Sequence, residues 1–212
     1  APRIGTARGT GRFGELESFG DFVDGRIMRM FVALNLPEDA REGLYAATKP
    51  LRDAGLPVRW LKPESLHITL KFLGWVRPED TERVAGTAAE AASKTRNFEL
   101  PIGGLGAFPT RRRPRVIWAG VEATPALRCL KHGLGWLFTP LGSEREIRAF
   151  QPHVTLGRTH RDAGAGEFRD LERLFEEVKF ETVVPVREID LMSSRLAHSG
   201  AEYERIASAP LG

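Results

Sequence analysis

The stretch Leu66-His67-Ile68-Thr69-Leu70-Lys71-Phe72-Leu73-Gly74 decides the fold, because its core returns later in the chain as His153-Val154-Thr155-Leu156-Gly157-Arg158. Both copies are typical of β-strands, since polar and apolar residues alternate and the apolar ones are mostly branched. Side chains alternate between the two faces of a strand. The first copy therefore predicts one polar face of His67, Thr69 and Lys71, and one apolar face of Ile68, Leu70 and Phe72.

The second copy repeats this pattern at its start, with His153 and Thr155 on one face and Val154 and Leu156 on the other. Arg158 falls on the apolar face, so a bend or bulge after Gly157 is needed to bring it round to the histidines. A single such motif is weak, because a lone histidine in a strand is usually a structural polar residue. Two copies with the same apolar frame indicate that the two histidines face a common site.

Composition limits the class of protein. The 212 residues suggest one compact domain of two lobes, or two small domains, and 42% hydrophobic with 28% charged residues is typical of a globular protein. No apolar run is long enough to span a membrane. The lone Cys129 cannot form an internal disulfide, so we expect a cytoplasmic protein. We expect this cysteine to lie on a helix and to point into the protein core. The net charge of +3 suits an anionic ligand without requiring one.

Residues 1–27 are rich in glycine and show no sustained periodicity, so we expect a flexible N-terminal extension without chemistry. This segment lacks the continuous apolar stretch of a secretory signal. Met28 or Met30 could begin the folded domain. The expected domain therefore covers residues 28–212.

A second repeat supports the first. The first half contains, in this order, a buried strand (29–36), a helix that begins at Pro37, the first histidine strand and a further helix from Pro78. The order recurs with a strand (116–121) and a helix that begins at Pro125. Pro37 precedes His67 by 30 positions, and Pro125 precedes His153 by 28. A helix (166–180) and strands (182–193 and 201–207) complete the chain.

This duplication predicts an α+β protein with two lobes related by a pseudo-twofold axis. We expect antiparallel-rich sheets that face a central cleft, with the helices outside. The lobes are expected to be built from approximately 28–110 and 111–208. In this arrangement the two histidine strands face each other across the cleft.

The two histidine motifs, together with Met30-Phe31-Val32-Ala33-Leu34 and Pro114-Arg115-Val116-Ile117-Trp118-Ala119-Gly120-Val121, resemble the two-histidine (2H) phosphoesterases. Within them, the chain is most similar to the bacterial and archaeal RNA 2′,3′-cyclic phosphodiesterases, also called 2′-5′ RNA ligases. The resemblance covers about residues 28–208. It implies a bilobal fold with both motifs in a central groove, metal-independent hydrolysis, and RNA ends or small cyclic-phosphate nucleotides as substrates.

The resemblance also implies roles for single residues. His67 is the proton donor, His153 the proton acceptor, and Thr69 and Thr155 bind phosphate. Arg158 matches the arginine that follows the second motif in the family. Lys71, which shares the predicted face of His67, is a further candidate for substrate binding.

The chemistry explains why two histidines are needed. Opening a cyclic phosphodiester requires one group to take a proton from water and another to give a proton to the leaving ribose oxygen. Because the ordinary histidine pKa is about 6.5, one ring can be neutral while the other is protonated near neutral pH. Threonine hydroxyls and a cation can hold the nonbridging oxygens. Together with the substrates that the resemblance implies, these groups predict hydrolysis of RNA 2′,3′-cyclic phosphate ends to 2′-phosphomonoesters.

Other classes of site have less support. Catalytic zinc usually takes three protein ligands, and His160 and His198 follow no ligand spacing, so we expect neither metal nor cofactor. No serine lies in a nucleophile-elbow motif. His132 is expected at the surface. The run of Arg111, Arg112 and Arg113 is either a solvated loop or a contact to phosphate.

Two alternatives stay open. One is ligation of 2′-5′ ends, which is the reverse chemistry. The other is a noncatalytic module that binds RNA ends or nucleotides. In either case we expect a monomer that makes no contact with membranes.

Overall fold

The computed structural model describes residues 27–143, 149–197 and 200–212. Apart from Ile27, the expected N-terminal extension lies outside the described residues, and so does His198. No helix in the described ranges is long and apolar enough to cross a bilayer.

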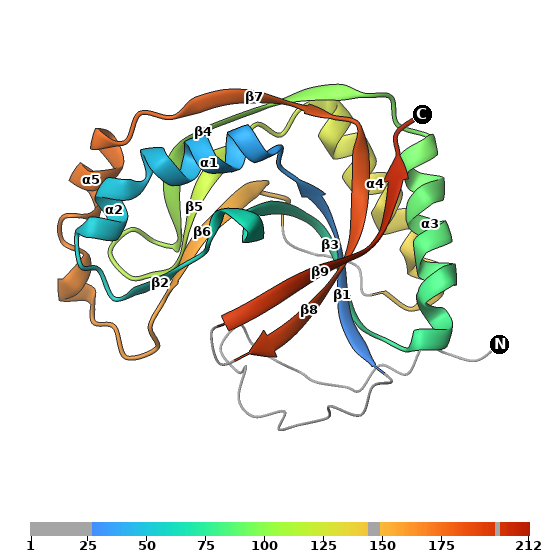
Figure 1. The fold of residues 1–212 in the computed structure, drawn as a ribbon, viewed down its shortest axis with the longest axis horizontal. Coiled ribbons are helices and arrows are strands. Elements are labelled where there is room, and N and C mark those ends of the chain that lie inside the picture. The colour runs from blue at the N-terminus through green and yellow to red at the C-terminus, as the bar shows by residue number, and fades with distance from the viewer. Residues whose placement is uncertain (1–26, 144–148, 198–199) are drawn as a thin grey trace.

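One curled, antiparallel sheet forms the framework (Figure 1). Along the sheet the strand order is β7-β4-β5-β6-β3-β1-β8-β9, and β2 pairs with β6 off this path. Within the described part of the chain, the nine strands are β1 (Met28–Asn35), β2 (Val58–Trp60), β3 (His67–Val76), β4 (Phe98–Pro109), β5 (Pro114–Val121), β6 (His153–Thr159), β7 (Glu181–Val186), β8 (Glu188–Ala197) and β9 (Gly200–Pro210).

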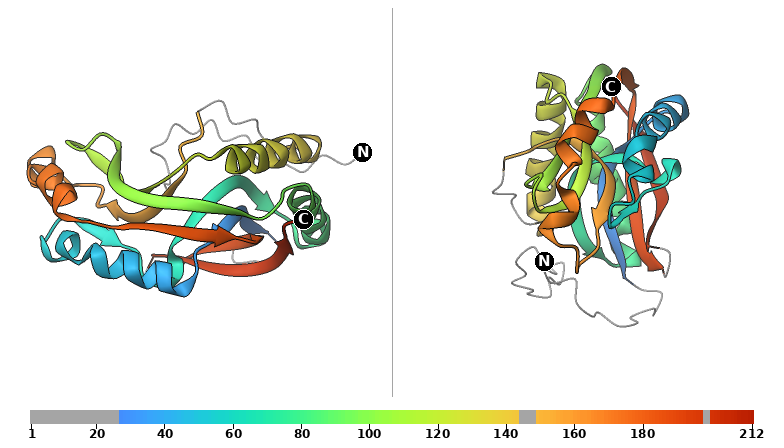
Figure 2. Two further views of the ribbon diagram at one scale, coloured as in Figure 1. Left: turned by 90° about the horizontal axis from the view of Figure 1, so that it is seen from above. Right: turned by 90° about the vertical axis from the view of Figure 1, so that its left-hand side faces the viewer.

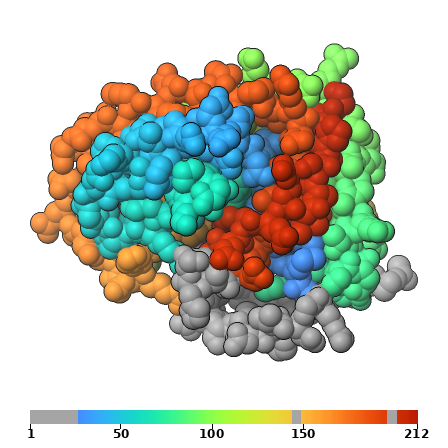
Figure 3. All heavy atoms as spheres, in the orientation of Figure 1, coloured from blue at the N-terminus to red at the C-terminus, as the bar shows by residue number. Residues whose placement is uncertain are grey.

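The helices gather in two groups at opposite ends of this sheet (Figures 1 and 2). The helices are α1 (Glu38–Ala47), α2 (Lys49–Asp53), α3 (Thr81–Ser93), α4 (Pro125–Phe138) and α5 (Leu171–Glu177). At one end α2 packs beside α5, and at the other α3 packs beside α4. On the face shown in Figure 3, the atoms of α1 and α2 in blue and cyan lie to the left of those of β8 and β9 in red.

The strand order confirms the predicted pseudo-twofold arrangement. The two histidine strands, β3 and β6, do not face each other across a cleft as expected: they are neighbours at the centre of one continuous sheet, and the pair Ile68–Val154 joins them. On each side follow a strand that precedes a helix (β1 or β5) and then two further strands. The two halves of the sheet do not coincide with the expected chain segments 28–110 and 111–208. β4, from the first segment, pairs with β5 and β7. β8 and β9, from the second segment, extend the half that contains β1 and β3.

A stripe of leucines anchors α4 in the core. In α4, Leu127, Leu130 and Leu134 are at most 1% exposed, and the side chain of Thr124 caps the helix by accepting a hydrogen bond from the N–H of Leu127. The prediction for Cys129 was wrong, because this residue is exposed. At about 100° per residue, position 129 points away from the stripe that the three leucines define. His132 is exposed, as expected.

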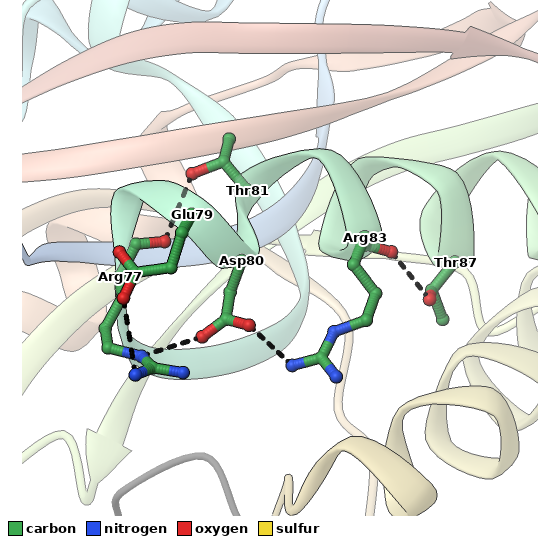
Figure 4. A network of polar contacts seen from close by, with 6 residues as sticks. All are labelled: Arg77, Glu79, Asp80, Thr81, Arg83 and Thr87. Carbon is green, nitrogen blue, oxygen red and sulfur yellow. Dashed lines mark hydrogen bonds and ion pairs between the residues drawn. The ribbon is translucent and has the colours of Figure 1, made fainter. Parts of the chain in front are cut away.

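A polar network fixes the chain where β3 leads into α3 (Figure 4). Asp80 is 7% exposed and accepts hydrogen bonds from Arg77 Nε at 2.9 Å and Arg83 Nη2 at 2.6 Å. Arg77 also lies 3.3 Å from Glu79 Oε1. A nearly buried carboxylate needs such partners, because an unpaired charge in this position is costly. The network thus holds the end of the first histidine strand against α3.

Candidate active site

The histidines and threonines of the two motifs form a two-by-two array on one face of the sheet. Ile68 and Val154 pair directly and point to the core, where both are 0% exposed. The residues that flank this pair therefore point to the other face. Its register sets His67 across from Thr155 and Thr69 across from His153, so the two histidines lie on one diagonal. Diagonal neighbours in an antiparallel sheet are roughly 7–8 Å apart.

A β-bulge brings Arg158 to this face, as its sequence position required. Trp118 pairs with Thr155 but Ile117 pairs with Gly157, so Leu156 is an extra residue in β6. After it Val116 pairs with Arg158. Because Val116 and Trp118 lie two residues apart on β5, Arg158 shares the face of Thr155. The bulge lies just before Gly157 rather than after it.

The equivalent bulge in β3 overturns the placement of Lys71. Ala33 pairs with Thr69 but Val32 pairs with Lys71, so Leu70 is the extra residue. Lys71 therefore shares the core face of Val32 and is 2% exposed. Phe72 instead points to the face of His67, beside Phe31, and is 56% exposed. Strict alternation along the strand predicted the opposite for both residues, because nothing in the local pattern marks the insertion.

Both histidines have the same tautomer. His67 Nδ1 lies 2.9 Å from the carbonyl oxygen of Ser65, and His153 Nδ1 lies 2.8 Å from that of Gln151. A carbonyl oxygen only accepts hydrogen bonds, so Nδ1 is the donor in each ring. The Nε2 atom of each neutral ring is then unprotonated and free to exchange a proton with a ligand.

The surroundings lower the pKa of both histidines. Burial lowers the pKa of His67 to about 4, a hydrogen bond to the Ser65 carbonyl opposes this, and the charges of Arg158 and His153 add to the lowering. Burial likewise lowers the pKa of His153, the Gln151 carbonyl opposes it, and Arg158 adds to it. Both rings are therefore neutral at pH 7 in the free protein. Arg158 acts on both, so its guanidinium lies near the histidine pair.

Aromatic rings pack around each histidine. The ring centroid of His67 lies 5.0 Å from that of Phe31 and 4.8 Å from that of Tyr203. That of His153 lies 5.1 Å from Phe108 and 6.2 Å from Trp118. These contacts explain the low pKa values, because aromatic walls exclude water from the charged form. The four rings come from four different strands, so sequence reasoning missed them as site residues.

Close packing fixes the position of Trp118. A Cβ added at Gly106 would lie 2.2 Å from Cζ2 and Cη2 of the Trp118 ring, so the indole lies directly over this glycine. Trp118 also contacts Phe108, with centroids 5.0 Å apart. Gly106 thus holds open the space in which the ring beside His153 sits.

A polar network lies beside His67. Asn35 pairs with His67 across β1 and β3, and its Nδ2 donates a 2.8 Å hydrogen bond to Asp190. Asp190 is 1% exposed and also accepts a hydrogen bond from Ser208. These residues come from β1, β8 and β9, and only the tertiary structure brings them together.

The arginine run in the β4–β5 loop is partly engaged elsewhere. Arg111 forms an ion pair with Glu172 at 2.7 Å and lies over the ring of Phe175. Beyond the run, Arg115 donates to the carbonyl oxygen of Arg161. A cavity of about 550 Å³ opens between β4, β5 and β7, and the histidines do not line it. Across the described ranges, no three His, Cys, Asp or Glu side chains cluster in a way that could hold a metal ion.

Comparison with known proteins finds relatives that are similar to this chain in sequence and in fold. A family model described as LigT like Phosphoesterase matches residues 34–118. An RNA 2′,3′-cyclic phosphodiesterase of Archaeoglobus fulgidus is 33% identical, over 84% of this chain and 97% of its own length. One of the same name from Methanothermobacter thermautotrophicus is 31% identical, over 83% and 95%. The crystal structure of TT0787 of Thermus thermophilus is similar with a TM-score of 0.71 and 27% identity, over 87% of this chain and 98% of that one.

Proposed function

Because this chain belongs to the LigT-like two-histidine (2H) phosphoesterases, we propose that it hydrolyses RNA 2′,3′-cyclic phosphate ends to 2′-phosphomonoesters without a metal ion. The general activity is that of an RNA 2′,3′-cyclic phosphodiesterase, a phosphoric diester hydrolase. The direction of opening, the roles of the residues and the independence from metal form the proposal. We further infer that the enzyme acts as a monomer on RNA ends in the cytoplasm.

The diagonal placement of His67 and His153 supports this function most directly. Displacement at phosphorus requires the attacking and the leaving oxygen to lie on opposite sides of the phosphorus atom. Diagonal neighbours are roughly 7–8 Å apart at the backbone, so two imidazoles on one diagonal of this face can lie on either side of a phosphate. Each Nδ1 is bound to a carbonyl, so each Nε2 can serve as the atom that transfers the proton.

The proposed roles are as follows. Neutral His153 takes a proton from water, and the resulting hydroxide attacks phosphorus. Protonated His67 gives its Nε2 proton to the departing 3′ oxygen, which leaves the phosphate on the 2′ oxygen. His67 enters this cycle from a pKa of about 4, so the negative charge of the bound phosphodiester must raise its pKa.

The other residues of the array bind the phosphate. Thr69 and Thr155 occupy the second diagonal, where their hydroxyls can donate hydrogen bonds to the nonbridging oxygens. Arg158 lies near both histidines and can pair with the negative charge that these oxygens already carry in the bound substrate. Lys71 is excluded from this set because it lies on the core face.

The test is a product analysis. A short RNA that ends in a 2′,3′-cyclic phosphate is incubated with the protein, and the position of the phosphate in the product is determined by nuclear magnetic resonance of phosphorus. We expect a 2′-phosphomonoester. Binding without turnover would favour a noncatalytic module, and joining of the RNA to a 5′-hydroxyl end would favour ligation.

A further inference from the structure

Two arginines lie side by side next to the histidine array. In the short pairing of β2 with β6, Arg59 is the direct partner of Arg158. Paired residues of neighbouring antiparallel strands share a face and lie about 5.5 Å or less apart at Cα. Arg59 therefore points to the same face as Arg158, and both side chains are exposed.

The packing beneath β2 holds this arrangement in place. Val58 and Trp60, which flank Arg59, close over Gly157, where an added Cβ would lie 2.6 Å from Val58 Cγ1 and 2.9 Å from Trp60 Cε3. Val58 is 7% exposed and belongs to the core. The backbone of Arg59 is thus anchored by the core, although its side chain is exposed.

The pair is not neutralised within the described ranges. Neither arginine donates a hydrogen bond or an ion pair there, whereas Arg77, Arg83, Arg111 and Arg173 each contact a carboxylate. Like charges directly opposite each other destabilise a sheet. Anionic groups bound to the two guanidinium groups would relieve this repulsion, and phosphate suits the fork geometry of arginine.

The arginine pair lies beyond the histidine array along β6. Thr155 is followed on this face by Arg158, and Arg59 lies beside Arg158 on β2. The charge of Arg158 also lowers the pKa of both histidines. The histidine array and the arginine pair therefore follow one another along the same face of the sheet. A strand of RNA presents its phosphates in a similar succession, with the cyclic phosphate at the end.

We propose that Arg59 binds the phosphodiester just upstream of the terminal nucleotide, so that the enzyme selects RNA strands over free 2′,3′-cyclic mononucleotides. This inference rests on the proposed function and extends it to a second phosphate site. A charge-assisted hydrogen bond to a phosphate is worth about 1.5–3 kcal/mol, which corresponds to roughly a 10- to 150-fold preference.

The experiment compares two substrates, cytidine 2′,3′-cyclic phosphate and a cytidine dinucleotide with the same cyclic end. In the wild type, kcat/KM should be higher for the dinucleotide. The variant Arg59→Gln should lose about tenfold or more on the dinucleotide and stay within about twofold on the mononucleotide. Arg59→Lys keeps the charge and should lose less. An equal loss on both substrates, or no loss on the dinucleotide, would overturn the inference.

Arg115→Gln is the matched control, because it removes one positive charge from β5, the strand that pairs with β6. Arg115 points to the opposite face of the sheet from Val116 and Arg158. It should leave the substrate preference unchanged. Binding is measured in parallel with a fluorescent dinucleotide that carries a 3′-phosphate, and Arg59→Gln should bind it more weakly than the wild type does. Absence of turnover on both substrates would contradict the proposed function, while equal binding by wild type and Arg59→Gln would contradict the second phosphate site.

Discussion

Phe72 occupies in β3 the position that Arg158 occupies in β6. Each lies two residues beyond the extra leucine of its motif, Leu70 or Leu156, and each points to the face of the sheet that carries the histidines. The two motifs are otherwise closely alike, and so are the two ester oxygens of a 2′,3′-cyclic phosphate. Under the proposed function, the contrast between an exposed ring and a guanidinium is a feature by which the site can distinguish the two ester oxygens of its substrate.

The first prediction concerns Arg158. Replacing it by alanine should mainly raise KM, because the lost interaction is with phosphate that is already charged in the ground state. A loss of about 1.5–3 kcal/mol corresponds to a 10- to 150-fold rise. Arg158→Lys keeps the charge but not the forked guanidinium, so its KM should lie between those of the wild type and Arg158→Ala. Steady-state kinetics on the RNA substrate check this, and a wild-type KM and kcat in Arg158→Ala would remove the residue from the site.

The second prediction concerns metals. Each motif supplies one histidine and one hydroxyl rather than a ligand cluster, so activity should survive exhaustive treatment with EDTA. The rate is measured before and after chelation, and again after a divalent ion is added back. Loss with EDTA and recovery with the ion would contradict a metal-independent mechanism.

The third prediction concerns Gly106. In Gly106→Ala the new methyl group would overlap the Trp118 ring, which must then move away from Phe108 and His153. Overpacking of this kind costs about 1–3 kcal/mol, so both Tm and kcat should fall although no chemical group is lost. Gly135→Ala is the control, since nothing lies within 4 Å of an added Cβ there and alanine favours the helix. An unchanged Tm in Gly106→Ala would mean that the ring adapts without strain.

Much of the fold was predictable because it rests on repetition and alternation. The strands of the paired motifs and the proline-started helices are local patterns, and the structure confirms them. Arg158 was placed correctly because its mismatch with the alternation pointed to a bulge. Lys71 was misplaced because the matching bulge at Leu70 leaves no such trace: a lysine on the polar face looks normal in sequence.

What sequence could not supply comes from distant strands. Tyr203 from β9 makes an edge contact with the ring of His67, and Arg59 lies beside Arg158 because a three-residue strand pairs with β6. Asp190 is buried beside Asn35 through a contact that spans more than a hundred residues. No short pattern around any of these residues marks it as part of a site, because the register of the whole sheet brings them there.

The fourth prediction concerns stability at low pH. The pKa of His67 is about 4 in the folded protein and about 6.5 in the unfolded chain. Its contribution to stability is therefore complete above pH 6.5 and is lost as the pH falls towards 4, because only the unfolded chain takes up the proton in this range. This should cost about 2 kcal/mol between pH 7 and pH 5.

Urea unfolding at the two pH values measures this loss. His67→Gln does not titrate and should lose less stability than the wild type over the same interval. His132→Gln is the control, because it removes an exposed histidine of α4 that lies outside the histidine pair. Equal pH dependence in the wild type and His67→Gln would show that His67 titrates normally in the folded protein.

The last prediction concerns the division of labour between the histidines. General acid or base assistance contributes typically about 10²–10⁴-fold, so His67→Ala and His153→Ala should each lose kcat by about that factor. The wild-type pH–rate profile should be bell-shaped. The bell for kcat/KM should lie at lower pH than that for kcat, because burial lowers both histidine pKa values in the free enzyme and the bound phosphate raises them.

The pH limbs alone cannot assign the roles, since a coupled pair titrates with macroscopic constants that belong to both residues. The leaving group can assign them. A cyclic substrate with a more acidic 3′ leaving group needs little help from an acid, so it should restore His67→Ala far more than His153→Ala. If His153→Ala is the variant that recovers, then His153 is the acid and His67 the base. This reversed result would fit the low pKa of His67 in the free protein and would show that the bound phosphate does not raise it enough for His67 to act as the donor.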